Sequence, residues 1–196
     1  MSAGTGESEQ VREQARAARG DKTLPIVSAG DPVLRTRASE VAEGKLGSPE
    51  LLNLVELMIA TMRAAPGVGL AAPQIGLPLR IIVLEDPPDV VSTLADEARA
   101  ARGRVPFPVI AIVNPVLHLI EGETATFFEG CLSVPGYSAQ VTRALTVEVT
   151  GKTPMGDAFS WRVSGWPARI LQHECDHLDG TLYVDRMDTR TLSRSG

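Results

Sequence analysis

Residues 167–180 read PARILQHECDHLDG and carry two histidines four positions apart. Proline is favoured at the first position of a helix, and glycine is favoured just beyond a helix end. The segment therefore predicts a helix from about Pro167 to Asp179, ended by Gly180. Its apolar residues lie beside the histidines, which indicates that at least one face of this helix is buried.

His173, Glu174 and His177 form an HExxH motif within this predicted helix. Side chains at positions i and i+4 project from the same helix face, so the two imidazoles can bind one metal ion. The glutamate can then act as a general base toward water at that ion. Cys175 lies about 200° around the helix from His173, so we expect it to pack in the core.

A catalytic metal site needs a third protein ligand and one open position. No glutamate follows Glu174, and Tyr183 stands where an extended zinc-protease motif has a third histidine. Asp185 and Asp188 remain downstream candidates. Cys131 is the upstream candidate, because a thiolate beside two imidazoles is a known catalytic ligand set. Its position alone fits a ligand and a small buried core residue equally well.

The chain has 196 residues, of which 43% are hydrophobic and 22% are charged, with a formal net charge of −5. This composition predicts one folded domain and excludes an intrinsically disordered chain. The acidic balance argues against a nucleic-acid-binding protein, and no apolar run approaches the length of a membrane span. Two cysteines cannot form a disulfide framework, and the N-terminus lacks a secretory signal, so we expect a cytoplasmic protein.

The rest of the sequence favours an α+β fold with hairpin-connected strands. Ser48 and Pro49 predict the start of a second helix that ends before Pro66. Residues 66–76 contain three glycines and two prolines, which predicts a loop without a regular element. Strands are expected at 80–84, 109–113, 116–120, 144–150 and 159–163, and an insertion with a short helix at 86–106. We expect a mobile tail at 1–22, one catalytic domain at 23–188 and a short C-terminal tail at 189–196.

Three motifs together resemble those of the bacterial peptide deformylases. They are GVGLAAPQ at 67–74, EGCLS at 129–133 and QHECDH at 172–177, in the family's order and spacing. The resemblance covers about residues 23–188 and implies antiparallel sheets around a central helix that carries HExxH. It also implies hydrolysis of the N-formyl group from the formyl-methionyl N-termini of nascent polypeptides, which releases formate.

The resemblance further implies the roles of individual residues. The metal ligands would be Cys131, His173 and His177, and the catalytic groups would be Glu174, the side-chain amide of Gln74 and the backbone N–H of Leu132. Residues expected to contact substrate are Val68, Gly69, Leu70, Glu129 and Gly130. Arg143 is expected to support Glu129 through an ion pair. The family usually carries Fe²⁺ in the cell, whereas the divalent-metal order favours Zn²⁺ at such a site, and Ni²⁺ or Co²⁺ are further alternatives in a purified sample.

Two other classes of function compete with this interpretation. An HExxH endopeptidase would not need Cys131 as a ligand. A metal-stabilised or formyl-peptide-binding module would close its metal site with a fourth side chain, such as Cys175 or His118. The expected partners of a deformylase are formylated peptides and nascent chains, with a transient ribosome contact. We expect a monomer, with no membrane association and no specific nucleic-acid site.

Overall fold

The computed structural model describes residues 23–194, so the N-terminal tail predicted at 1–22 lies outside the described residues. The helices are α2 (Pro49–Ala64), α3 (Pro88–Ser92), α4 (Asp96–Arg102) and α5 (Trp166–Leu178). The strands are β1 (Gly69–Ala71), β2 (Ile81–Asp86), β3 (Phe107–Leu119), β4 (Thr124–Cys131), β5 (Val134–Ala144), β6 (Thr146–Lys152), β7 (Ala158–Ser164) and β8 (Ser193–Arg194). Short 3₁₀ helices occur at Pro32–Arg35, Glu43–Lys45, Ala72–Ile75, Tyr183–Asp185 and Thr189–Thr191.

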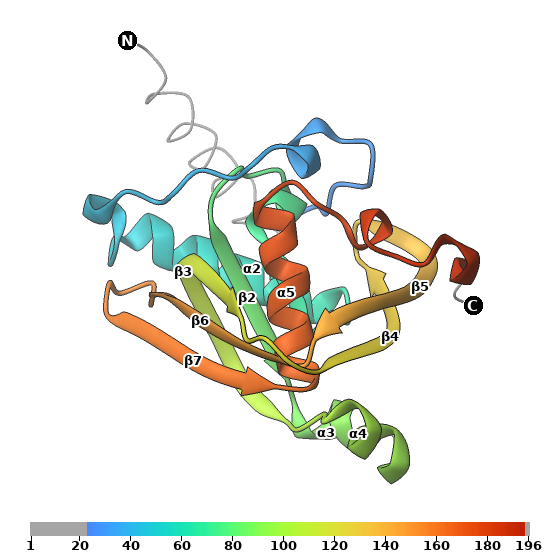
Figure 1. The fold of residues 1–196 in the computed structure, drawn as a ribbon. Coiled ribbons are helices and arrows are strands. Elements are labelled where there is room, and N and C mark those ends of the chain that lie inside the picture. Colours follow the sequence, from blue (N-terminus) through green and yellow to red (C-terminus); the bar gives the residue numbers. More distant parts are fainter. Residues whose placement is uncertain (1–22, 195–196) are drawn as a thin grey trace.

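The strands form two antiparallel sheets, as Figure 1 shows. One sheet has the order β1-β2-β3-β6-β7, and the other has the order β4-β5-β8. Helix α5 packs on the five-stranded sheet and is also hydrogen-bonded to β5 of the smaller sheet through Arg169 and Gln172. The predicted α+β class, with antiparallel sheets around a helix that carries HExxH, is therefore confirmed.

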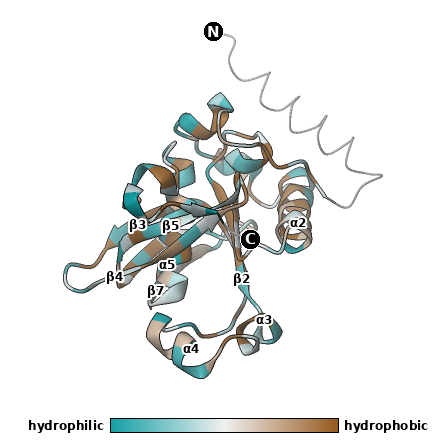
Figure 2. Cartoon of the chain, turned by 90° about the vertical axis from the view of Figure 1, so that its right-hand side faces the viewer, coloured by the Kyte–Doolittle hydropathy of each residue, from teal (hydrophilic) through white to brown (hydrophobic). Residues whose placement is uncertain are grey.

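Strand β2 separates two hydrophobic clusters. Ile81 and Val83 pack with the apolar face of α2, whereas Ile82 and Leu84 pack with α5. This arrangement follows from the period of two in a strand, since successive side chains point to opposite faces. Figure 2 shows α2 to one side of the sheet and the segment with α3 and α4 projecting at the lower edge of the molecule. The five-stranded sheet thus has α5 packed on one face and α2 packed on the other.

Both predicted long helices are present. Ser48 caps α2, because its side-chain oxygen accepts a hydrogen bond from the backbone N–H of Leu51 at 3.3 Å. Beyond α5, Gly180 adopts a φ of 74°, in the left-handed region. A Cβ at this glycine would lie 2.8 Å from the carbonyl carbon of Arg35, so the end of α5 meets a neighbouring segment at close range.

In four places the structure differs from the strand predictions or adds to them. Residues 109–119 form part of one strand rather than two, because β3 passes through Asn114 and Pro115 with a shift of register against β6. The loop predicted at 66–76 contains β1 and a 3₁₀ helix, since its backbone pairs with β2. The β4–β5 hairpin was not predicted. Within the predicted C-terminal tail, Ser193 and Arg194 form β8, which pairs with β5.

Candidate active site and metal centre

Helix α5 presents His173 and His177 on one face, as predicted from their spacing. The centres of the two rings are 5.0 Å apart, and the rings are nearly perpendicular at 74°. Glu174 follows His173 on the same helix and is only 4% exposed. Burial is the largest influence on its carboxyl group and raises the pKa of Glu174 to about 7.

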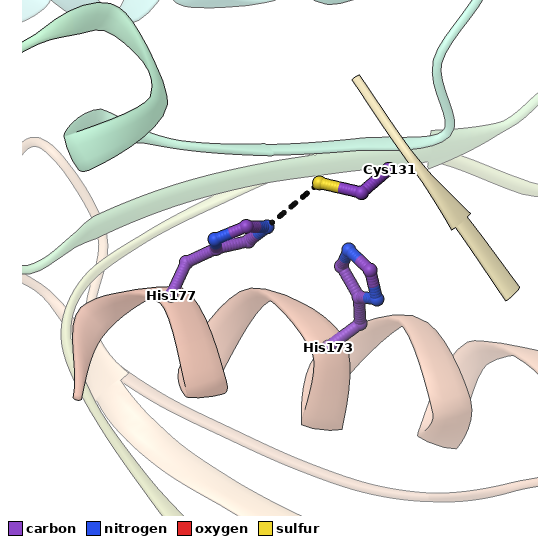
Figure 3. A group of neighbouring side chains, drawn as sticks. All are labelled: Cys131, His173 and His177. Atoms are coloured by element: carbon purple, nitrogen blue, oxygen red, sulfur yellow. Dashed lines mark hydrogen bonds between the residues drawn. The ribbon is translucent and has the colours of Figure 1, made fainter. Parts of the chain in front are cut away.

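Cys131 brings the third donor from the end of β4. Its Sγ lies 3.3 Å from Nε2 of His177, and Figure 3 shows the thiol pointing toward both imidazoles. The ligand atoms of Cys131, His173 and His177 all lie within 4.8 Å of one another. The register of the β4–β5 hairpin shifts between Gly130 and Cys131. Such an irregularity re-aims a side chain, and here it accompanies a thiol that faces the site.

These three residues fit a divalent metal ion. One sulfur and two imidazole nitrogens form a three-ligand set that leaves a fourth position open. Among residues 23–194, Oε2 of Glu174 and Nδ1 of His177 are buried without a hydrogen-bond partner. Buried polar atoms are usually paired, so the unpaired oxygen of Glu174 indicates that a polar group occupies the adjacent space when the site is in use.

Glu129 orients His173 from the opposite side of its ring. Its Oε2 lies 3.0 Å from Nδ1 of His173, while Arg143 donates to both carboxylate oxygens at 3.0 and 2.9 Å. Arg169 donates to Oε1 at 2.6 Å. Burial alone would raise the pKa of Glu129, but hydrogen bonds from Arg143 and His173 outweigh it and hold this pKa well below its usual range. The carboxylate therefore stays ionised and fixes the orientation of the His173 ring.

The ion pair predicted between Arg143 and Glu129 is present. Both oxygens of the Glu129 carboxylate accept hydrogen bonds from protein donors, and Glu129 also lines the cavity, so its contact with substrate stays a prediction. One expected substrate contact needs correction. Leu70 is fully buried in the cluster around α2, so its side chain does not reach the cavity. Cys175 is 5% exposed and packs in the core, as expected, and burial raises the pKa of its thiol to about 12.

The remaining predicted residues surround a cavity of about 480 Å³ next to the three donors. Val68, Gly69, Gly130 and Leu132 line it together with Gln74. The side-chain oxygen of Gln74 accepts from the backbone N–H of Ala71 at 2.9 Å, so its Nε2 is directed toward Cys131 Sγ, 3.5 Å away. A local bond therefore sets the orientation of this amide.

Only a glycine at position 69 leaves the carboxyl group of Glu174 where it lies. A Cβ built there would lie 2.2 Å from Oε1 of Glu174 and 2.7 Å from its Cδ. No heavy atom can approach a carboxylate so closely without displacing it. Gly69 therefore lets β1 pack directly against the catalytic face of α5.

A family model described as polypeptide deformylase matches residues 23–193. The chain belongs to the peptide deformylase family. It is 54% identical to peptide deformylase 1A, chloroplastic/mitochondrial, of Arabidopsis thaliana over 167 residues. These residues are 85% of this chain and 62% of that protein. It is 54% identical over 170 residues to peptide deformylase 3 of Streptomyces avermitilis, which is 87% of this chain and 74% of that protein.

Solved structures of peptide deformylases share the fold. The Met-Ala-Ser-bound class I type b enzyme of Acinetobacter baumannii matches with a TM-score of 0.75 and 35% identity, over 84% of this chain and 98% of that one. In residues 23–194, no helix is long and apolar enough to cross a membrane.

Several side chains at the peptide deformylase site were not singled out from the sequence. Arg169 and Asp176 extend the ion-pair network, because Asp176 contacts Arg143 and Arg186. Arg104 and Trp166 line the cavity. Of these residues, only Arg169 could have been singled out from the sequence. It is a charged residue beside apolar residues of a helix expected to be buried, and buried charges are almost always paired.

Proposed function

We propose that this protein is a metal-dependent peptide deformylase that removes the formyl group from formyl-methionyl N-termini. The observation that carries the proposal is the convergence of Cys131, His173 and His177 beside Glu174, at a cavity large enough for a peptide N-terminus. In the reaction, water adds to the formyl carbon, the bond from that carbon to nitrogen breaks, and formate and a free amine leave.

The three donors would hold one divalent cation, for which we propose Fe²⁺ in the cell. When bound, such an ion supplies a Lewis acid that lowers the pKa of water toward neutrality. Fe²⁺ comes from the family resemblance, whereas the affinity order of divalent metals favours Zn²⁺ at sulfur and nitrogen donors.

Glu174 moves the proton. Its carboxylate accepts a proton from the attacking water, and the carboxylic acid so formed donates that proton to the leaving nitrogen. Burial raises the pKa of Glu174 above its usual range, toward the neutral pH at which one group can both accept and donate a proton.

Gln74 and Leu132 are proposed to stabilise the negative charge that develops on the formyl oxygen. The backbone N–H of Ala71 holds the side-chain oxygen of Gln74, so the amide nitrogen faces the site, where it contacts Cys131 Sγ and Ser133 Oγ at 3.5 and 3.4 Å. The backbone N–H of Leu132 is the second proposed donor. Val68, Gly69 and Gly130 line the cavity and are proposed to contact the peptide.

The cellular setting follows from this proposal. Substrates would be nascent chains, reached through a transient contact with the ribosome, and the enzyme would act as a monomer in the cytoplasm. Some relatives carry chloroplastic or mitochondrial names, so the location within the cell stays a prediction.

The test is formate release from formyl-Met-Ala-Ser by protein purified without oxygen and loaded with Fe²⁺. We expect formate and free Met-Ala-Ser in equal amounts, and no turnover of acetyl-Met-Ala-Ser as the matched control. Cleavage of internal peptide bonds without formate release would instead identify an endopeptidase. Stoichiometric metal without any turnover would identify a structural metal site.

A further inference from the structure

Asp176 lies on α5 directly before the metal ligand His177, and its carboxylate contacts two arginines. Arg186 donates from Nε and Nη2 to Oδ2 and Oδ1 of Asp176, both at 2.7 Å. Arg143 donates from Nη1 to Oδ2 of the same carboxylate. Asp176 therefore joins an arginine of the segment that follows α5 to an arginine of β5.

Arg143 continues the connection from Asp176 toward the metal centre. Its Nε and Nη2 donate to the two oxygens of Glu129, and Oε2 of Glu129 lies 3.0 Å from Nδ1 of His173. The side chains of Arg143 and Glu129 are each 4% exposed, and that of Asp176 is 12% exposed. Four contacts thus connect Arg186 to His173, and positive and negative groups alternate from Arg186 to Glu129.

Arg186 is the outer end of this chain of contacts. Its side chain is 50% exposed, and it does not line the cavity beside the metal ligands. Its backbone N–H donates to the carbonyl of Tyr183 at 3.0 Å, so the turn that follows α5 sets its position. A bidentate pair restricts both partners to one geometry. Arg186 therefore fixes the plane of the Asp176 carboxylate from outside.

We propose that Arg186 is a positioning residue for the metal ligand His173 and acts through Asp176, Arg143 and Glu129. This inference rests on the proposed metal-dependent function. Loss of Arg186 leaves the carboxylate of Asp176 free to rotate. Arg143 then loses a fixed partner, and so does Glu129, which orients the His173 ring. Groups that orient a metal ligand in this way contribute to metal affinity although they do not touch the ion.

The charge of Arg186, taken alone, predicts the opposite effect on metal binding. Removing a guanidinium takes a positive charge away from the surroundings of a divalent cation, which would raise the affinity for that cation. Positioning predicts a lower affinity, because a misaligned His173 binds the ion less well. The sign of the change therefore distinguishes the two effects.

The experiment measures the Co²⁺ affinity of Arg186→Met by competition with a chelator. We expect the affinity to fall by about 10-fold, near the lower limit for groups that orient a metal ligand. The visible absorption bands of bound Co²⁺ should shift, because they report the geometry of the ligands. With saturating metal, kcat for formyl-Met-Ala-Ser should fall while KM stays the same, since Arg186 does not line the cavity.

Arg190→Met is the matched control. It removes the same charge from the same segment, and Arg190 pairs with the exposed Asp188. We expect neither a fall in Co²⁺ affinity nor a shift of the absorption bands. The midpoints of urea unfolding of the metal-free proteins should differ little, because Arg186 is half exposed and Asp176 keeps its contact with Arg143.

A double-mutant cycle with Asp176→Asn tests the route. If Arg186 acts through Asp176, the two substitutions are not additive, and Arg186→Met should lower the Co²⁺ affinity little further in the Asp176→Asn background. A full additional loss in that background would exclude the route through Asp176.

The other outcomes separate this inference from the proposed function. An unchanged or higher Co²⁺ affinity in Arg186→Met overturns the inference, and so does an equal fall in Arg190→Met. Absorption bands identical to those of the unmodified protein also contradict it, because the geometry of the ligands would then be unaltered. An unmodified protein that binds Co²⁺ without releasing formate contradicts the proposed function alone, since affinity and absorption still test Arg186.

Discussion

Glu174 is the residue on which the proposed chemistry depends most. It is buried beside two metal ligands, and one of its oxygens has no partner within residues 23–194. Glu174→Gln keeps the size of the side chain but removes its ability to accept a proton. We expect kcat to fall by about 10²–10⁴-fold, the usual contribution of a general base, while bound metal stays at one ion per chain. Formate release and elemental analysis measure both, and turnover near the original rate would refute the proposed role.

Arg169 contributes to stability through the buried carboxylate of Glu129. It donates to Glu129 and to two backbone carbonyls, on Val141 and Ala125. We expect Arg169→Met to lower the free energy of unfolding by about 3 kcal/mol. This value is near the lower limit for removing one partner of a buried ion pair, because Glu129 keeps its pair with Arg143. Metal affinity should also fall about 10-fold or more, since Glu129 orients His173.

Urea unfolding and metal titration measure these two effects of Arg169→Met. The control is Arg190→Met, because the pair between Arg190 and Asp188 is exposed and should leave both quantities unchanged. Identical unfolding curves for Arg169→Met and the unmodified protein would show that the network is not needed for stability.

At the scale of elements, the packing of β1 against α5 depends on Gly69. We expect Gly69→Ala to lower kcat by about 100-fold, because the added methyl group displaces the carboxylate of Glu174, and a displacement of about 1 Å can cost that much. Gly44→Ala is the control, since no heavy atom lies within 4 Å of a Cβ at Gly44. Equal kcat values for the two variants would contradict this account of β1.

The sequence predicts some elements better than others for physical reasons. Helix α5 has local signals, namely Pro167, Gly180 and the spacing of the histidines. The β4–β5 hairpin escaped prediction because β4 buries only Glu129 fully, so its half-buried face carries few large apolar residues to mark a strand. Strand β1 has only three residues, and its pairing with β2 is set by tertiary contacts rather than by the glycine-rich sequence.

For the candidate site too, residues that are close together in the sequence could be placed relative to one another, whereas residues far apart in the sequence could not. The positions of His173, Glu174 and His177 follow from helix geometry alone. The approach of Cys131 depends on two elements separated by more than forty residues, so residue spacing left its role open and only the family resemblance assigned it. Arg104 and Trp166 meet through a segment between β2 and β3, which no motif marks.

At the scale of the whole molecule, the metal ligands connect the two sheets. Cys131 lies at the end of β4 in the three-stranded sheet, while His173 and His177 lie on α5, which packs on the five-stranded sheet. A bound ion would therefore link two parts of the fold that otherwise meet through side-chain contacts.

Removal of the metal should lower thermal stability for this reason. An ion present at 100 times its dissociation constant stabilises the folded state by about 2.7 kcal/mol. For a chain of this size, that corresponds to a fall in Tm of roughly 5–10 °C after chelation. Thermal unfolding followed by circular dichroism, with and without chelator, measures the shift. Cys131→Ala should show no shift on chelation, and a shift equal to that of the unmodified protein would exclude Cys131 as a ligand.

The most direct test of the account is anomalous diffraction at the absorption edge of the metal, from crystals of the loaded protein. We predict one peak, about 2.3 Å from Sγ of Cys131 and about 2.0–2.1 Å from one nitrogen of each of His173 and His177, with no fourth protein side chain bound to it. A peak held by a fourth side chain, or a Cys131 sulfur turned away from the ion, would contradict the account.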